Sequence, residues 1–470
     1  MLNKLIISSS LVISLAGTPL LANANDDVYA KFPVTLKEYK GTKTNTVSYS
    51  GQIARHTLHD SLKKLAGKGN GKPNSELRAQ MMSYFSGKEG GRSIIAPASK
   101  GDFIVKQVNV DQISKKKNIS GKTYKGTING MPNNMTGPEL VKFWIEKASS
   151  ANKGVDRANG YNYPQLISKF IIGGMMYNQA VDNYLDEKLS ADTKPNNKPY
   201  KKGAHYTGKE HSWDEGFGYF GAPAHTLTLT PADVYAIAKR KKGAIKKADY
   251  NGDGKVDLKT EMTFAPAYYA SGYDKAGKGK SYLHTITKAF LVGRKLIASV
   301  GGEKLTDQQR ALLREYAAVI AKNWEMVLAE SVHKYAGSVY NDMEKLKTIM
   351  DAKGDTTKME SKYLKHWGEL KGFALGLQTG KGNLGETATK LNRMIGAGPV
   401  LINSSQVVDI DSKSNYVRDQ ANWGEYMLHM AKVQKLMVDK FGIKVRTKSI
   451  TGDLASLAKK LGAGNTAEND

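Results

Sequence analysis

The sequence predicts an all-α protein of two helical bundles, with an irregular insertion in its N-terminal part and an EF-hand-like calcium loop. Three observations support this fold class. Apolar residues recur at helical spacing through most of the chain. Several capping boxes mark helix starts, and one histidine–tryptophan motif occurs late in each half. This repeated motif indicates that the two bundles are related.

Residues 1–24 have the pattern of a cleaved secretory signal peptide. Lys4 precedes an apolar stretch over residues 5–21, and Ala22-Asn23-Ala24 provides a small-x-small cleavage site. The alternative is an uncleaved anchor helix. However, Gly17-Thr18-Pro19 interrupts the stretch, and a membrane span needs about 20 mostly apolar residues. The chain has no cysteine that could carry a lipid anchor. We therefore expect a soluble protein that is periplasmic or secreted.

The first bundle is predicted to occupy residues 25–265. Residues 25–50 should be extended, and a helix should follow because the apolar residues after them share one helical face: Ile53, Leu58, Leu62 and Leu65. Residues 66–136 are rich in glycine, lysine and asparagine, and they form the predicted insertion. Thr136 and Glu139 then form a capping box that begins the next helix.

Two more helices complete the first bundle. Residues 163–189 should form a long buried helix, in which Gly173-Gly174 requires either a closely packed neighbouring helix or a kink. Thr230-Pro231 should begin a helix that runs to about residue 248.

The second bundle is predicted over residues 266–470. Its helices are expected at 280–300, 307–350, 357–378, 384–396, 415–440 and 451–461. Thr306 with Gln309, and Thr357 with Glu360, have capping-box spacing. Gly337 is a candidate break in the longest of these helices.

Composition limits the possible chemistry. The 470 residues include no cysteine, which excludes disulfides, thiolate metal sites and a cysteine nucleophile. Seventy Lys and Arg residues against 44 Asp and Glu residues give a formal net charge of +26. Such a surface attracts polyanions, including lipopolysaccharide and other outer-membrane or anionic surface components. Because the basic residues are dispersed and not interleaved with aromatic residues, we expect no specific nucleic-acid partner.

Two histidine motifs are candidate metal sites. His211 with Asp214 and Glu215, and His366 with Glu369, have spacings that place both groups on one helix face. Two ligands do not make a tight site, so further ligands are needed, with candidates at Glu210, Glu325, Glu330 and His333. The alternative is that these histidines form hydrogen bonds within the bundles and bind no metal.

Three segments carry a family resemblance: Ser48-Tyr49-Ser50-Gly51-Gln52-x-x-Arg55, residues 210–221 and residues 366–375. They resemble an uncharacterised domain family of exported bacterial proteins, many of them lipoproteins. That family is similar in turn to the imelysin group of iron-regulated periplasmic proteins. The resemblance implies two related helical bundles and a metal bound through a Gly-x-His-x-x-Glu signature.

Carried onto this chain, the signature places His211 as the histidine and Asp214 or Glu215 as its acid. Gly208 lies three residues before His211 instead of two, and His366 with Glu369 lacks the preceding glycine. The resemblance thus implies a transition metal such as iron or zinc, and a role in iron or other metal acquisition. Two alternatives are a binding module for an anionic surface or polymer, acting through the basic charge, and a metallopeptidase. We favour binding, because the chain has no His-Glu-x-x-His and neither motif offers a separate general base.

The segment from residue 249 to 261 predicts a structural calcium loop. Its expected ligands are at alternating positions: Asp249, Asn251, Asp253, Lys255 through its carbonyl, Asp257 and Glu261. Gly254 stands at position 6, where the EF-hand turn needs glycine. Position 12 is Thr260 instead of glutamate, and Glu261 follows it. A simple turn rich in Asp and Asn is the alternative.

Overall fold

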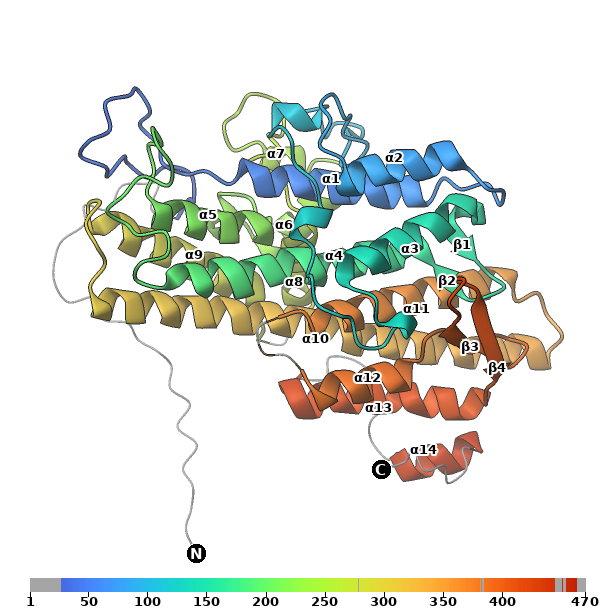
Figure 1. Ribbon diagram of the computed structural model, residues 1–470. Coiled ribbons are helices and arrows are strands. Elements are labelled where there is room, and N and C mark those ends of the chain that lie inside the picture. The colour runs from blue at the N-terminus through green and yellow to red at the C-terminus, as the bar shows by residue number, and fades with distance from the viewer. Residues whose placement is uncertain are drawn as a thin grey trace, which may run out of the picture.

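The computed structural model describes residues 27–277, 279–380, 382, 384–443, 450 and 454–462. The predicted signal peptide lies outside these residues. The described residues are 57% helix and 6% strand, which confirms the all-α class. Most helices lie with their axes nearly parallel (Figure 1). Among the described residues, no helix has the length and hydropathy needed to cross a membrane.

The first half contains seven α-helices and two π-helical segments within its described part. In chain order they are α1 Ser50–Ala66, α2 Ser75–Ser86, α3 Gly137–Ser150, α4 Tyr163–Ile171, η5 Ile172–Tyr177, η6 Gln179–Tyr184, α5 Gly208–Phe220, α6 Pro231–Lys239 and α7 Ile245–Ala248. Strands β1 Val155–Asp156 and β2 Tyr161–Asn162 pair antiparallel. Short 3-10 helices span Val110–Gln112, Ser120–Lys122, Pro132–Asn134, Asn152–Gly154, Glu187–Leu189 and Thr226–Thr228.

The second half contains longer helices and one hairpin. They are α8 Ala265–Lys275, α9 Tyr282–Ser299, α10 Asp307–Asp351, α11 Thr357–Leu377, α12 Glu386–Ile395, β3 Ser405–Ile410, β4 Tyr416–Gln420, α13 Trp423–Phe441 and α14 Leu454–Leu461. Strands β3 and β4 pair antiparallel with an irregularity between Val407 and Asp409.

Local signals identified most helix starts correctly. The capping boxes at Thr136 and Thr306 are formed. The box predicted at Thr357 is wrong, because Thr357 lies inside α11 and its backbone N–H donates to Asp355. The helix predicted from residue 230 to 248 is interrupted at Arg240, whose left-handed φ of 47° ends α6.

Two predictions in the second half also need correction. The helix predicted over 415–440 begins only at Trp423, because residues 416–420 pair with β3 as strand β4. Gly337 does not break α10, which is continuous from Asp307 to Asp351. Its missing side chain makes room for Gln434, since a Cβ on Gly337 would lie 2.3 Å from the Gln434 Nε2 atom.

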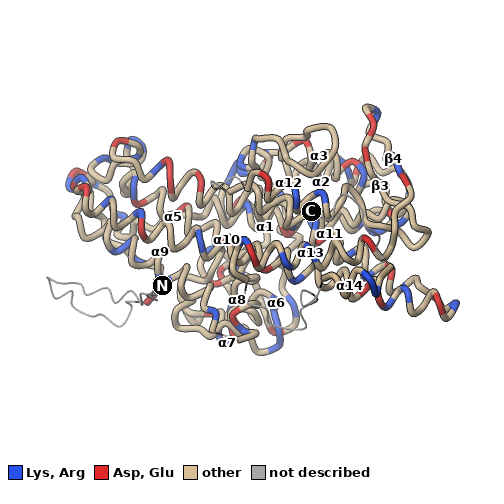
Figure 2. The backbone as a smooth tube through the Cα atoms, turned by 90° about the horizontal axis from the view of Figure 1, so that it is seen from below, with Lys and Arg blue, Asp and Glu red and all other residues tan. Residues whose placement is uncertain are grey.

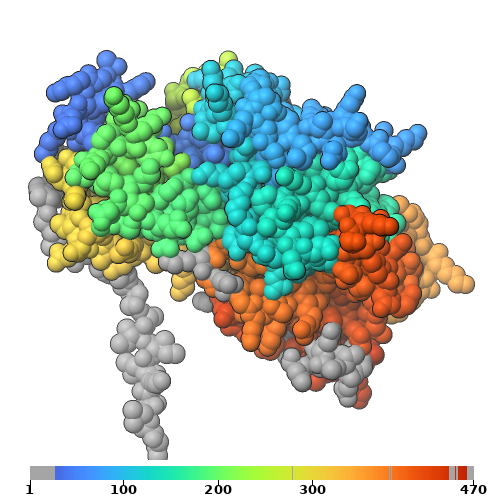
Figure 3. Space-filling view, viewed as in Figure 1, coloured from blue at the N-terminus to red at the C-terminus, as the bar shows by residue number. Residues whose placement is uncertain are grey.

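Helices from the two halves pack against each other. Helix α4 packs on α11, α5 packs on α9, and α10 contacts α9, α11 and α13. On the face shown in Figure 3, the blue-to-green first half lies directly against the orange part of the second. The division into bundles at residue 265 stays a prediction, because each half supplies core helices to the other.

The Gly173-Gly174 pair marks the closest helix contact between the halves. A Cβ on Gly173 would lie 2.5 Å from backbone atoms of Gly376 in α11. The predicted close approach of a neighbouring helix is therefore confirmed, and the helix also changes to π-helical geometry over residues 172–177.

We expect Gly173→Ala to destabilise the protein by about 1–3 kcal/mol, because the added methyl group overpacks a backbone-to-backbone contact. Gly272→Ala in α8 is the matched control, since its Cβ would meet Tyr235 at 3.5 Å, an ordinary contact distance. Alanine there should be neutral or stabilising by up to about 1 kcal/mol. Urea unfolding measures both variants, and an equal effect of the two would contradict the tight-contact explanation.

Candidate functional site

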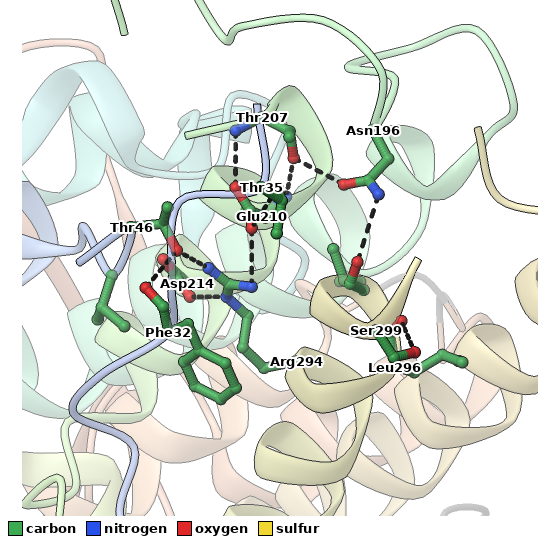
Figure 4. A network of polar contacts seen from close by, with 12 residues as sticks. Phe32, Thr35, Thr46, Asn196, Thr207, Glu210, Asp214, Arg294, Leu296 and Ser299 are labelled. Carbon is green, nitrogen blue, oxygen red and sulfur yellow. Dashed lines mark hydrogen bonds and ion pairs between the residues drawn. The ribbon is translucent and has the colours of Figure 1, made fainter. Parts of the chain in front are cut away.

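The first histidine motif is held in place by a buried arginine from α9. Arg294 donates from Nε to Asp214 (3.0 Å), from Nη1 to Glu210 (3.2 Å) and from Nη2 to the Thr46 hydroxyl (2.6 Å). All three charged side chains are fully buried. Figure 4 shows this network between α5, α9 and the extended segment before α1.

Asp214 has a structural position in this network. Besides the arginine, it accepts hydrogen bonds from the Tyr29 hydroxyl (2.7 Å) and the Ser48 N–H (3.0 Å). Burial raises the pKa of Asp214, and the charge of Arg294 opposes that shift. Both carboxylate oxygens of Asp214 therefore bond to partners in the core. Glu210 is also bonded within the core, to Arg294, and it forms the capping box of α5 with Thr207.

Glu215 and His211 lie one helix turn apart at the edge of the core. Glu215 accepts a hydrogen bond from Gln52 Nε2 (2.8 Å), and its Oε1 atom is 3.8 Å from His211 Nε2. The two side chains are 14% and 13% exposed, respectively. His211 packs against the rings of Tyr200 and Tyr206. Burial lowers the pKa of His211, so the ring is neutral at pH 7.

Four basic side chains lie in the region of Glu215, and we call Arg55, Lys117, Lys122 and Lys188 the cation cluster. The charge of Glu215 acts on all three lysines, while Arg55 repels Lys117 and Lys122. Burial is the largest cause that lowers the pKa of each lysine. Repulsion from cluster cations adds to it for Lys117 and Lys122, and repulsion from Lys194 adds to it for Lys188. None of the four has a carboxylate oxygen within 4 Å among the described residues.

The members of the cation cluster contact Tyr184 and the start of α1. Lys122 Nζ is 3.4 Å from the Tyr184 hydroxyl, and Lys188 Nζ lies 4.4 Å from the centre of the same ring. A Cβ on Gly51 would lie 3.6 Å from both Lys117 Nζ and Arg55 Nη1. The cluster thus spans the start of α1 and the aromatic surface of η6.

The start of α1 adds to this positive potential. Within the described chain, its first turn has no acidic residue and its N-cap, Tyr49, makes no side-chain capping bond. The side chains of α1 itself therefore do not compensate the partial positive charge of this helix N-terminus, and the nearby carboxylates, Asp214 and Glu215, come from α5. The arrangement is suited to holding a negatively charged group between α1, η6 and residues 117–122.

The second histidine motif has different partners. His366 Nδ1 is 2.5 Å from Asp342 Oδ2, and Asp342 also pairs with Lys362 at 3.1 Å. Glu369 lies 3.8 Å from Lys169 Nζ. His366 and Glu369 are therefore each engaged by another helix. Across the described part of the chain, no three His, Asp or Glu side chains come close enough to hold a metal ion.

The candidate calcium loop is folded around its own carboxylates. Asp249 accepts backbone hydrogen bonds from Gly252, Asp253 and Gly254 at 2.8–3.1 Å. Glu261 closes the loop by accepting from the N–H groups of Tyr250, Asn251 and Asp257.

Contacts to the insertion hold this loop from outside. Lys106 pairs with Asp253 at 2.7 Å, and Gln107 donates to Asp257 at 2.8 Å. Helix α7 ends directly before Asp249. Carboxylate and amide oxygens are the ligand types that calcium prefers. Lys106, however, pairs with Asp253 and would compete with the ion for that carboxylate. The calcium site stays a prediction.

We expect calcium at 100 times its Kd to stabilise the protein by about 2.7 kcal/mol, because it binds only the folded loop. Asp249→Ala should abolish this response, which a thermal melt with calcium or chelator measures. Asp411→Ala is the control, because Asp411 accepts the N–H groups of Lys413 and Asn415 in a similar turn without the EF-hand spacing. A wild-type melt unaffected by millimolar calcium would contradict the prediction.

The structure brings together two of the segments named from sequence. In α1, Gln52 bonds to Glu215 of α5, and Arg55 interacts with the Tyr219 hydroxyl of the same helix. Gly218 allows this approach because a Cβ there would lie 2.6 Å from Tyr49 Cβ. The site residues Lys117, Lys122 and Lys188 were not predicted from sequence; Lys117 lies in a loop, and Lys122 and Lys188 lie in short 3-10 helices. No spacing pattern could have related these lysines to α1.

The fold and site define a helical protein with a cationic polar site built on α1 and α5. A family model for a domain of unknown function, DUF4856, matches residues 38–235, which include the cation cluster. The match agrees with the predicted resemblance to an uncharacterised domain family, and the relation to the imelysin group stays a prediction. No curated protein and no solved structure matches the chain.

Proposed function

We propose that this protein is an exported binding protein that captures a phosphate- or carboxylate-bearing ligand at the cation cluster. The observation that carries the proposal is the group of four cations around a single shared carboxylate, Glu215. Partly buried lysines without carboxylate partners are costly to the folded protein, and a bound anion would remove that cost. Export rests on the predicted signal peptide.

The same charges argue against a divalent metal at His211 and Glu215. Four nearby cations would repel a metal ion, and Asp214 is already bonded to Arg294. Iron or zinc binding at these residues, a role in metal acquisition, and metallopeptidase activity therefore remain predictions that the geometry favours less than anion binding.

General surface charge is the competing explanation for any anion binding. Figure 2 shows Lys and Arg distributed along the described part of the chain, including α14 and the region of α6 and α7. The test must therefore separate the cation cluster from equal charge placed elsewhere.

The experiment is titration calorimetry of the mature protein with inorganic phosphate, citrate and a heparin oligosaccharide, at low and high salt. Lys117→Ala with Lys122→Ala should weaken binding about tenfold for each lysine removed, because each charge-assisted contact is worth about 1.5 kcal/mol. The control, Lys64→Ala with Lys68→Ala, removes two exposed lysines, one in the last turn of α1 and one just beyond its end. It should leave affinity within about twofold.

Two results would contradict the proposal. An equal loss in both double variants would assign binding to general charge. Stoichiometric zinc or iron binding that is lost in His211→Ala but kept in the lysine variant would instead establish a metal site.

A further inference from the structure

A separate pocket of about 560 Å³ lies where α6, α8, α10 and α13 meet. Its size falls within the range of small-molecule sites. The residues that matter to its chemistry are four tyrosines and two polar side chains: Tyr235, Tyr268, Tyr269, Tyr273, His333 and Gln434. All but Tyr235 lie outside the region that the family model matches.

The tyrosines present ring surfaces to this pocket. Tyr235 and Tyr268 stack with their centres 5.0 Å apart, and Tyr269 meets Tyr268 edge to face at 5.1 Å. The hydroxyls of Tyr235 and Tyr268 bond to each other, and that of Tyr273 bonds to Ser331 at 2.7 Å. The rings thus supply apolar contact area, with hydroxyls engaged by the protein.

Two buried polar atoms at the pocket have no hydrogen-bond partner in the described structure. Gln434 is 4% exposed, and its Nε2 atom donates to the His333 carbonyl at 3.0 Å. Its Oε1 atom has no donor, and His333 Nε2 is also unpaired. Buried polar groups are normally paired, so two at one pocket indicate partners that come from outside the chain.

Gly337, which is unfavourable within a helix, leaves the space that Gln434 occupies at the pocket. Gly337 lies in the interior of the 45-residue helix α10, where glycine is less favourable than alanine. Any side chain at this position would collide with the Gln434 amide, which a Cβ would approach to 2.3 Å. Gln434 can therefore occupy this position only because residue 337 is glycine.

The interior of this pocket carries little uncompensated charge. Glu330 pairs with Lys280 and accepts a hydrogen bond from the Tyr282 hydroxyl at 2.6 Å. Burial lowers the pKa of His333 to about 4, so its ring is neutral at pH 7. Lys275 and Lys334 also line the pocket; Lys275 Nζ lies 4.9 Å from the centre of the Tyr235 ring, and burial lowers the pKa of Lys334. Ring surfaces with neutral polar groups suit an uncharged ligand that has hydroxyls on an apolar ring.

We propose that this tyrosine pocket binds a neutral saccharide. A sugar ring packs its C–H face on the tyrosines, one hydroxyl donates to Gln434 Oε1, and another pairs with His333 Nε2. A fully apolar ligand would leave both polar atoms unpaired. Among the lining residues, an anionic ligand would find cations only in Lys275 and Lys334.

Thermal melts of the mature protein with glucose, galactose, N-acetylglucosamine, maltose and cellobiose test this proposal. At a concentration of 100 times Kd, a bound sugar should raise Tm by about 3 °C for a chain of this size. Failure of every sugar in this set to shift Tm or to give heat in calorimetry at 50 mM would overturn the proposal.

Three variants locate the site of any response. Gly272→Leu should fill the pocket and abolish the shift, whereas Gly272→Ala should keep it, because its methyl group only reaches contact distance of Tyr235. Gln434→Met should lose at least tenfold in affinity. Its ligand-free Tm should change little, since losing the Nε2 bond to the His333 carbonyl offsets the removal of an unpaired acceptor. A sugar response unchanged in Gly272→Leu and Gln434→Met would overturn the assignment to this pocket. The cation-cluster lysine variants should respond to sugar as the wild type does.

Discussion

Replacing Arg294 by methionine should destabilise the protein by about 3–5 kcal/mol, because the change leaves Glu210 and Asp214 buried without their cation. The arginine also bonds Thr46, so α9, α5 and the extended segment before α1 all lose a shared partner. Chemical denaturation followed by circular dichroism measures the loss directly. Lys288→Met is the matched control, because it removes an exposed cation from the same helix and should change stability by less than about 0.5 kcal/mol.

A compensated variant tests the physical reason. If buried charge causes the loss, Glu210→Gln and Asp214→Asn added to Arg294→Met should recover part of it, since the carboxylates no longer need a cation. A stability of Arg294→Met within about 1 kcal/mol of the wild type would contradict the importance of this network. So would a triple variant that is less stable than Arg294→Met alone.

Acidification from pH 6.5 to pH 4 should remove about 3 kcal/mol of stability through His56 alone. His56 is 1% exposed, lies 3.1 Å from the Gly218 carbonyl through Nε2, and stacks on Phe264. Burial lowers its pKa to about 4, while Asp60 acts in the opposite direction and His59 in the same one. Each unit of difference between folded and unfolded pKa is worth about 1.36 kcal/mol.

The sign follows from proton binding. Above pH 6.5 His56 is neutral in both states and contributes nothing. As the pH falls through 6.5, His56 binds a proton in the unfolded chain. In the folded chain it stays neutral until about pH 4, so the free energy of unfolding falls over this range.

Urea unfolding of wild type and His56→Gln at pH 7 and pH 4 measures this contribution. The glutamine variant should lose about 3 kcal/mol less between the two pH values. His284→Gln, which replaces a half-buried histidine of α9, is the control and should follow the wild-type profile more closely. An identical pH dependence in His56→Gln and the wild type would contradict the prediction.

Helix positions were largely predictable because their signals are local. The capping box at Thr306 and the apolar periodicity after it predicted a helix over 307–350, and α10 spans Asp307–Asp351. Predictions from local sequence failed where a residue had another partner that the local pattern does not show. Asp355 accepts the N–H of Thr357, so the capping box predicted at Thr357 is not formed, although α11 begins at the predicted residue. Residues 416–420 have a strand partner that sequence periodicity does not show.

The sequence by itself determined the all-α class, the absence of thiol chemistry and the basic charge, because these depend on composition and on residues a few positions apart. It also identified Gln52, Arg55, His211 and Glu215 as residues of interest. Only the tertiary structure decided their roles. The Gln52–Glu215 contact joins residues 163 positions apart, and the Arg294–Asp214 pair joins residues 80 apart. Such contacts depend on how whole helices pack, so tertiary packing assigns Asp214 to the core and leaves Glu215 among the cations.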